Sequence, residues 1–287
     1  MKHKHLRVQP GVLIRLSEID PSDTNGFKGK DDAREKLVHD IHKLEKLQEK
    51  LAASRSYAVL IVLQGMDSSG KDGAIKHVMS GINPQGVDVH AFKQPSEEEL
   101  SHDFLWRTQK ALPERGRIGI FNRSYYEEVL VVRVHSDLLA AEHVETNGKD
   151  IWRERFEDIN SYERHLVRNG TRILKFFLHI SKDEQRRRLV ARLDDSSKIW
   201  KFSRSDATER EYWDQYIAAY EQMLSATSTD HAPWHVIPAD HKWFSRTAIG
   251  EILVDTLESL DLSYPAPSAA EEQALSRIRK HLELEKR

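Results

Sequence analysis

Five short apolar runs are spaced along the chain, and segments with helical patterns separate them. The runs cover residues 57–64, 87–92, 117–121, 172–180 and 234–239. Each is about as long as a typical strand, and the first is apolar without interruption, as expected of a strand buried on both faces. Strands that alternate with helices predict a mostly parallel five-stranded sheet with helices on both faces, a three-layer α/β/α sandwich.

The helical segments show apolar positions at steps of three and four residues. In residues 31–53 these positions are leucines and an isoleucine, and the opposite face is charged, so we expect an amphipathic helical extension. Ser96 and Glu99 have capping-box spacing and predict a helix start. Other helices are expected at 72–81, 123–133, 150–169, 182–194, 206–227 and 243–260. The proline-bounded tail, 265–287, is predicted to be a charged helix at most.

Composition narrows the class of protein. The 287 residues suit one large α/β domain, and the net charge of −2 argues against a general nucleic-acid binder. The chain contains no cysteine, which excludes disulfides, thiolate metal sites and cysteine nucleophiles and fits a reducing compartment. No apolar run is long enough for a bilayer span, and the basic N-terminus lacks the features of a signal peptide. We expect a cytoplasmic protein without a membrane partner.

The loop after the first strand carries the strongest chemical signal. It reads GMDSSGKDG, and Gly65, Gly70 and Lys71 have the spacing of a phosphate-binding P-loop. A strand leads into it and a helix leads out, so backbone N–H groups and a helix N-terminus would face an anion. The alternative is a glycine-rich turn without a ligand. The predicted phosphate-binding residues of this loop are Gly65, Ser68, Ser69, Gly70, Lys71, Asp72 and Gly73.

Two carboxylates in this loop need an explanation, because they would repel phosphate. Asp72 stands where a P-loop has the hydroxyl that holds Mg²⁺, and Asp67 lies inside the loop. A divalent cation between carboxylate and phosphate reverses the sign of the interaction. We therefore predict that Asp67 is a ligand of Mg²⁺, with Mn²⁺ as a possible substitute. For Asp72 a structural role at the first turn of a helix is favoured over metal binding.

A second polar cluster follows the third apolar run. Asn122 can hydrogen-bond a ligand, Arg123 can neutralise phosphoryl oxygens, and Glu127 would lie on the same helix face as Arg123 and point at the cation. The alternative is an ordinary surface Arg–Glu pair at a helix start. Asn122, Arg123 and Glu127 are the predicted nucleotide-binding residues, and Glu127 is a second candidate metal ligand.

A local excess of basic residues lies between positions 182 and 204. The basic residues are Lys182, Arg186, Arg187, Arg188, Arg192, Lys198, Lys201 and Arg204, against Asp183, Glu184, Asp194 and Asp195. Because the segment begins at the carboxyl end of a predicted strand, a lid over phosphates at 182–210 is favoured over a solvated charged helix. An RNA backbone is a weaker alternative, since Trp200 and Phe202 are the only candidates for base stacking. Predicted phosphate contacts here are Arg188, Arg192, Lys198, Lys201 and Arg204, with Arg133 from the preceding motif.

Four motifs in this order resemble the family-2 polyphosphate kinases: GMDSSGKDG, IFNRSYYEEVLVVRVH, SKDEQRRRLVARLDD and WKFSRSDATEREYWDQYIAAYE. The similarity runs from about Arg7 to Tyr264. It implies a fold like that of thymidylate kinases, phosphate and metal handling by Asp67 and Lys71, phosphate contacts from Arg123 and lid contacts from Arg188. Asn122 with Glu127 matches the subgroup that accepts both AMP and ADP. Family members are often dimers or tetramers, so a homo-oligomer is expected.

The expected reaction is a Mg²⁺-dependent phosphoryl transfer between inorganic polyphosphate and adenine or guanine nucleotides, AMP and ADP above all. Asp67, Lys71, Arg123 and Arg188 are the predicted catalytic residues. Three alternatives remain: a polyphosphate kinase that accepts ADP only, a nucleotide kinase that uses ATP, and a polyphosphate- or RNA-binding protein without catalysis. Asp72 in place of the hydroxyl argues against the ATP-using kinase.

Overall fold

A five-stranded parallel sheet forms the centre of the protein. The computed structural model describes residues 3–142, 144, 150–197, 199 and 208–285. The strands are β1 (Ala58–Gln64), β2 (Val87–Ala91), β3 (Ile118–Asn122), β4 (Thr171–His179) and β5 (Trp234–Pro238). Their order is β2-β3-β1-β4-β5, and every pairing is parallel. The predicted α/β fold is confirmed, and each strand lies within two residues of its predicted bounds.

The central position of β1 explains its uninterrupted apolar sequence. It pairs with β3 on one side and with β4 on the other, and all seven of its residues are buried. Ile61 faces Ile120 of β3 and Leu174 of β4 in register. A strand that is covered on both faces has no position for an exposed polar side chain. The loop that follows Gln64 therefore emerges at the middle of the sheet edge.

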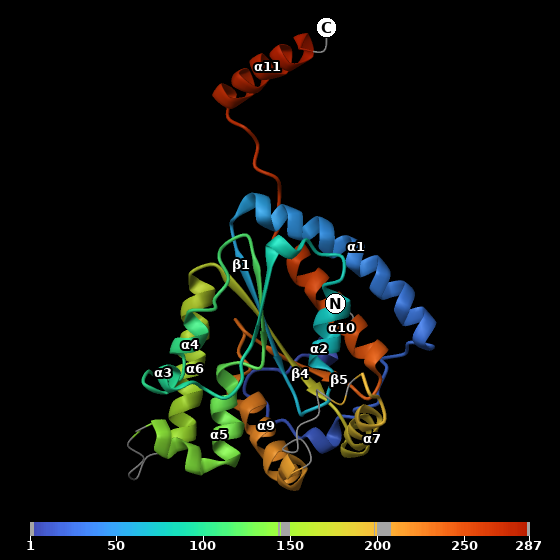
Figure 1. Ribbon diagram of the computed structural model, residues 1–287, viewed down its shortest axis with the longest axis vertical. Coiled ribbons are helices and arrows are strands. Elements are labelled where there is room, and N and C mark those ends of the chain that lie inside the picture. The colour runs from blue at the N-terminus through green and yellow to red at the C-terminus, as the bar shows by residue number, and fades with distance from the viewer. Residues whose placement is uncertain (1–2, 143, 145–149, 198, 200–207, 286–287) are drawn as a thin grey trace.

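Helices cover both faces of the sheet, as Figure 1 shows. Helices α1, α2 and α10 pack together on one face, and α5, α6 and α9 lie on the other. The helices are α1 (Lys30–Ser54), α2 (Lys71–Val78), α3 (Glu97–Leu100), α4 (Trp106–Gln109), α5 (Val131–Val134), α6 (Ile151–Arg168), α7 (Lys182–Leu193), α9 (Trp213–Thr227), α10 (Lys242–Glu258) and α11 (Ala269–Leu284).

The prediction of one continuous helix at 123–133 is wrong. Arg123 has a left-handed φ of 64° and Ser124 is extended, so no helix begins there. A 3-10 turn at Tyr125–Val129 follows, and the α-helical part is only Val131–Val134. The Ser96–Glu99 capping box is confirmed, but that helix ends at Leu100. These irregular segments border the cavity that contains the candidate site.

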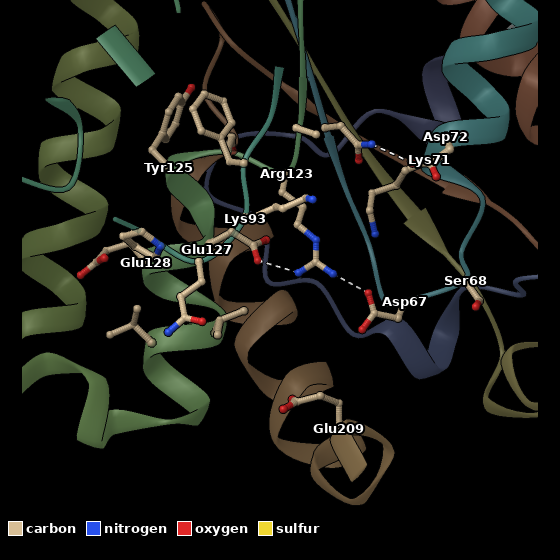
Figure 2. A pocket seen from close by; sticks show the side chains of 18 of the residues that line it. Asp67, Ser68, Lys71, Asp72, Lys93, Arg123, Tyr125, Glu127, Glu128 and Glu209 are labelled. Carbon is tan, nitrogen blue, oxygen red and sulfur yellow. Dashed lines mark hydrogen bonds and ion pairs between the residues drawn. The ribbon is translucent and has the colours of Figure 1, made fainter. Parts of the chain in front are cut away.

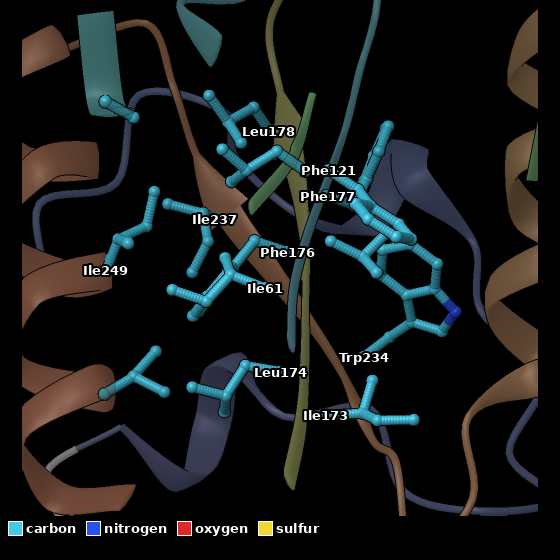
Figure 3. Close-up of a cluster of buried hydrophobic side chains, with 14 of the residues drawn as sticks. Ile61, Phe121, Ile173, Leu174, Phe176, Phe177, Leu178, Trp234, Ile237 and Ile249 are labelled. Atoms are coloured by element: carbon cyan, nitrogen blue, oxygen red, sulfur yellow. The ribbon is translucent and has the colours of Figure 1, made fainter. Parts of the chain in front are cut away.

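The hydrophobic core lies on both faces of the sheet. Figure 3 shows Ile61, Phe176 and Ile237 among its buried side chains, together with the indole of Trp234. One ionic pair lies inside this apolar surrounding: Lys175 of β4 and Glu163 of α6, both with fully buried side chains. A charged pair at such depth needs complete hydrogen bonding to be tolerated.

The tail helix α11 stands apart from the body of the protein (Figure 1). None of its residues is buried, although Leu275, Ile278 and Leu282 recur at helical spacing. The prediction of a charged helical tail is consistent with this arrangement. No helix in the described part of the chain is long and apolar enough to cross a bilayer.

Candidate active site

One large cavity opens at the carboxyl ends of the strands, where parallel sheets bind their ligands. Its volume is about 1540 Å³. The loops after β1, β2 and β3 line it, and α7 and α10 contribute further side chains. Of the predicted site residues, the cavity brings together Asp67, Ser68, Gly70, Lys71, Asp72, Gly73, Asn122, Arg123, Glu127, Arg188 and Arg192.

Glycine is required at two positions of the loop between β1 and α2. Gly65 has a φ of 150°, and a Cβ there would lie 2.8 Å from the carbonyl oxygen of Leu178. Gly70 has a φ of 113° and is the N-cap of α2. Ser68 also adopts a left-handed φ of 62°, although it is not glycine. The loop is therefore a strained turn that is held in shape by its surroundings, a common property of ligand-binding loops.

Lys71 is folded back onto this loop. Its Nζ donates to the carbonyl oxygens of Gly65 at 2.5 Å and Met66 at 3.2 Å, and little of the side chain is exposed. Burial, together with the charge of Arg123, lowers the pKa of Lys71 from 10.5 to about 8, against the opposing effect of Asp67. The ammonium is thus desolvated and close to a phosphate position, where an anion would raise its pKa again.

Arg123 joins the two loops at the centre of the site. Its Nη1 donates to Oε2 of Glu127 at 2.8 Å, and its Nη2 donates to Oδ1 of Asp67. Figure 2 shows the guanidinium between these two carboxylates. Gln64 donates to the other oxygen of Glu127 at 2.9 Å. The Glu127 charge, followed by that of Asp67, holds the pKa of Arg123 well above its usual value, so the residue stays a cation.

These contacts limit what could hold a metal. Among the residues that the structure describes, no group of three histidine, aspartate or glutamate side chains is arranged as a metal site. Glu127 accepts hydrogen bonds from Arg123 and Gln64, so in this arrangement it holds the guanidinium in place. Asp67 lines the cavity and is partly exposed, and Mg²⁺ commonly takes only one or two carboxylates together with phosphate oxygens. The residues present therefore fit a cation that arrives with phosphate groups at Asp67.

Asp72 connects the glycine loop to the end of β3. Its Oδ1 accepts a hydrogen bond of 2.8 Å from Nδ2 of Asn122, which ties the first turn of α2 to the end of β3. The carboxylate also lies at a helix N-terminus, where negative charge is favourable. Asn122 therefore helps to position the loop as well as lining the cavity.

Arg188 has a different environment from the one expected of a lid residue. All five of its N–H donors are committed: Nε to Oε1 of Glu184, Nη1 to the carbonyl oxygens of Ser68 and Ser69, and Nη2 to those of Ala239 and Asp240. The side chain is almost completely buried. Arg188 thereby fastens the glycine loop to the segment after β5.

Several other predicted contacts lie outside the cavity lining. Arg133 donates to Gln222 and lies over the rings of Trp152 and Phe156, so the structure does not bring it to the glycine loop. Gly65 and Ser69 shape the loop from behind, since neither lines the cavity. Lys198, Lys201 and Arg204 lie outside the described residues.

An aromatic part of the cavity lining was missed by the sequence reasoning. Phe92 and Phe104 line it, each with an arginine over its ring: Arg107 at 5.4 Å from Phe92 and Arg155 at 4.3 Å from Phe104. Arg155 also pairs with Glu128 at 3.1 Å. Burial raises the pKa of Glu128 to about 8 despite this arginine. A buried carboxyl with a perturbed pKa beside aromatic rings is a sign of a functional site. These residues are far apart in the sequence, so only the fold shows that they lie close together.

The chain is similar to known proteins over nearly its whole length. Residues 28–264 match the family Polyphosphate kinase 2 (PPK2). The chain is 50% identical to the ADP-polyphosphate phosphotransferase of Rhodopseudomonas palustris, over 98% of this chain and 99% of the relative. It is 48% identical to the AMP/ADP-polyphosphate phosphotransferase of Meiothermus ruber, over 94% and 98%.

A solved structure shows the same fold over almost the whole chain. The crystal structure of Polyphosphate Kinase 2 from Arthrobacter aurescens TC1 superposes with a TM-score of 0.87 at 44% identity, and covers 96% of both chains. The chain therefore belongs to the polyphosphate kinase 2 family.

Proposed function

We propose that this protein transfers phosphoryl groups from inorganic polyphosphate to AMP and ADP. The observation that carries the proposal is one cavity whose lining combines two chemically different groups of residues. One group is the glycine loop with Lys71 and Arg123, and the other includes Phe92 and Phe104. Its volume of about 1540 Å³ exceeds the roughly 300–1,000 Å³ of a typical small-molecule pocket, which leaves room for two substrates.

The aromatic part of the lining suits a nucleoside. Phe92 and Phe104 offer apolar ring surface to a base, and Arg107 and Arg155, which lie over these rings, add positive charge there. The glycine-loop part suits phosphates, because it combines the N-terminus of α2 with two cations. A nucleotide that lies across the cavity would direct its terminal phosphate towards Arg123.

The chemistry requires alignment and charge neutralisation rather than a covalent group from the protein. Lys71 and Arg123 are placed to neutralise the charge on a transferring phosphoryl group. Asp67 would hold Mg²⁺, which when bound would neutralise negative charge on phosphate oxygens. Glu127 and Gln64 keep the Arg123 guanidinium in place, so that little rearrangement is needed when substrates bind.

The test is an incubation of the purified protein with polyphosphate and one nucleotide, in the absence of ATP. AMP is expected to give ADP and then ATP, and ADP is expected to give ATP. Production of ATP from ADP with no product from AMP would restrict the acceptor to ADP, in line with the name of the R. palustris relative. Phosphorylation only when ATP replaces polyphosphate would refute the proposal.

The role of Asp67 is tested with a matched pair of variants. Asp67→Asn removes the candidate metal ligand, and we expect the Mg²⁺ concentration for half-maximal rate to rise at least about tenfold. Asp72→Asn is the control, because its carboxyl is engaged by Asn122, and its Mg²⁺ dependence should stay that of the native enzyme. If both variants show the native Mg²⁺ dependence, Asp67 is not a metal ligand.

A further inference from the structure

Arg246 of α10 is a cation at the cavity wall that the motifs do not indicate. Its side chain is about half-buried and lines the cavity together with Lys242 and Ser245 of the same helix. Within the described part of the chain, the Arg246 guanidinium forms no hydrogen bond and no ion pair. An arginine that is partly desolvated without a carboxylate partner is unusual, because the loss of hydration is not offset.

The position of Arg246 relative to the glycine loop is set by Gly73. A Cβ at Gly73 would lie 3.3 Å from Nη2 of Arg246, so the guanidinium rests against the first turn of α2. Gly73 needs no left-handed φ, and glycine inside a helix costs about 0.5–1 kcal/mol relative to alanine. The close approach of Arg246 supplies the physical reason for a glycine there.

Arg188 lies near enough to Arg246 for their charges to repel. Burial lowers the pKa of Arg246, and the charge of Arg188 lowers it further. The two guanidinium groups differ in one respect. Arg188 has committed all five N–H donors to Glu184 and to backbone carbonyl oxygens, whereas those of Arg246 remain available. An anion between α2 and α10 would stabilise both cations.

We propose that Arg246 binds phosphate oxygens of the polyphosphate chain, and that Arg188 is a positioning residue that fixes the glycine loop. The proposal rests on the proposed function for the identity of the anion. It reverses the assignment that the sequence suggested, in which Arg188 contacts phosphate. Because Lys242 lines the cavity one helical turn before Arg246, the chain would leave the glycine loop along the start of α10.

The direct test is calorimetric titration of the full-length protein with inorganic tripolyphosphate in the presence of Mg²⁺ and without nucleotide. Arg246→Gln removes the charged hydrogen bonds and is expected to weaken tripolyphosphate binding about tenfold or more. The affinity of Arg246→Lys should lie between those of Arg246→Gln and the native protein. Arg153→Gln, which removes an equal charge from an exposed position on α6, is the control and should bind as tightly as the native protein. In turnover assays Arg246→Gln should raise the KM for polyphosphate and leave the KM for ADP unchanged.

Arg188→Lys provides the complementary measurement. Lysine cannot reach four carbonyl oxygens and Glu184 together, so we expect a lower unfolding temperature and a lower kcat, with a smaller effect on tripolyphosphate binding than that of Arg246→Gln. Native binding by Arg246→Gln would overturn the proposal. So would an increase in the KM for ADP alone, or a loss of binding in Arg188→Lys at unchanged unfolding temperature. Native protein that binds tripolyphosphate through Arg246 but phosphorylates no nucleotide would refute the proposed function and leave this assignment standing.

Discussion

The buried pair of Lys175 and Glu163 offers the sharpest test of how the fold supports the site. Lys175 Nζ uses all three donors, to Oε2 of Glu163 at 2.6 Å, to the hydroxyl of Tyr126 at 2.8 Å and to the carbonyl oxygen of Thr227 at 2.7 Å. The other oxygen of Glu163 accepts from the hydroxyls of Tyr125 and Tyr126, each at 2.8 Å. The network therefore pins the 3-10 turn that begins two residues after Arg123.

Replacing Lys175 with methionine keeps most of the volume and removes the charge. Glu163 then remains buried with one carboxylate oxygen unpaired, because the side chains of both residues have no exposed surface. Breaking a buried pair from one side destabilises a protein by about 3–5 kcal/mol. For a domain of 287 residues that corresponds to a decrease in unfolding temperature of about 5–8 °C.

The double variant Lys175→Met/Glu163→Gln separates charge burial from packing. It removes both charges, and the glutamine oxygen can still accept from a tyrosine hydroxyl, so we expect it to regain at least about 1 kcal/mol relative to Lys175→Met. Lys43→Met is the control, because its ion pair with Glu258 is exposed and worth at most about 1 kcal/mol.

Scanning calorimetry and urea titration measure these stabilities, and kcat with polyphosphate reports the position of Arg123. Two results would refute the reasoning: a Lys175→Met protein whose free energy of unfolding lies within about 1 kcal/mol of the native value, or a double variant that is no more stable than Lys175→Met.

Four further predictions concern the glycine loop, Lys71 and the tail helix. Gly65→Ala should abolish most activity and lower the unfolding temperature, since its Cβ would clash with a carbonyl oxygen at 2.8 Å; circular dichroism and turnover assays would detect both effects. Affinity for tripolyphosphate should fall by up to about tenfold per pH unit above pH 8 as Lys71, with its pKa of about 8, loses its proton. The same lowered pKa means that the unfolded chain binds more protons than the folded one between pH 8 and 10.5, so the Lys71 contribution to unfolding free energy should rise across that window. Deletion of residues 265–287 should change the unfolding temperature of the body by less than about 2 °C, because no residue of α11 is buried, and calorimetry of the truncated chain would show it.

The sheet could be predicted from the sequence because buried strands consist almost entirely of apolar residues. A strand such as β1, with neighbours on both sides and helices on both faces, must be apolar throughout, and its end is marked by the first glycine of the loop. The carboxyl ends of parallel strands share one edge, so the glycine loop and the Asn122 cluster could be placed together without coordinates. In the structure Leu63 of β1 pairs with Asn122 of β3, which places the ends of these two strands side by side.

The rest of the site depends on contacts between residues that are far apart in the chain. Arg188 was predicted to be a lid residue because it belongs to a run of basic residues. The carbonyl oxygens that it contacts belong to residues near positions 68 and 240, far from it in the sequence. Arg246 lies in a helix with no charge pattern of its own, and only the packing of α10 against α2 brings it to the loop. The contacts of Arg188 and Arg246 could not be predicted, because residue spacing along a chain does not show which loop packs against which helix.

The two carboxylates of the glycine loop are balanced by the loop after β3. Asp67 pairs with Arg123, and Asp72 accepts a hydrogen bond from Asn122, so each carboxylate of the glycine loop has a donor from the end of β3 or the loop after it. Because one guanidinium serves both Asp67 and Glu127, a cation bound at Asp67 would release one side of Arg123. The freed N–H donors would then be available to a phosphoryl oxygen, while Glu127 keeps the guanidinium in place. We therefore expect the affinities for Mg²⁺ and for polyphosphate to increase together, and the coupling to disappear in Asp67→Asn.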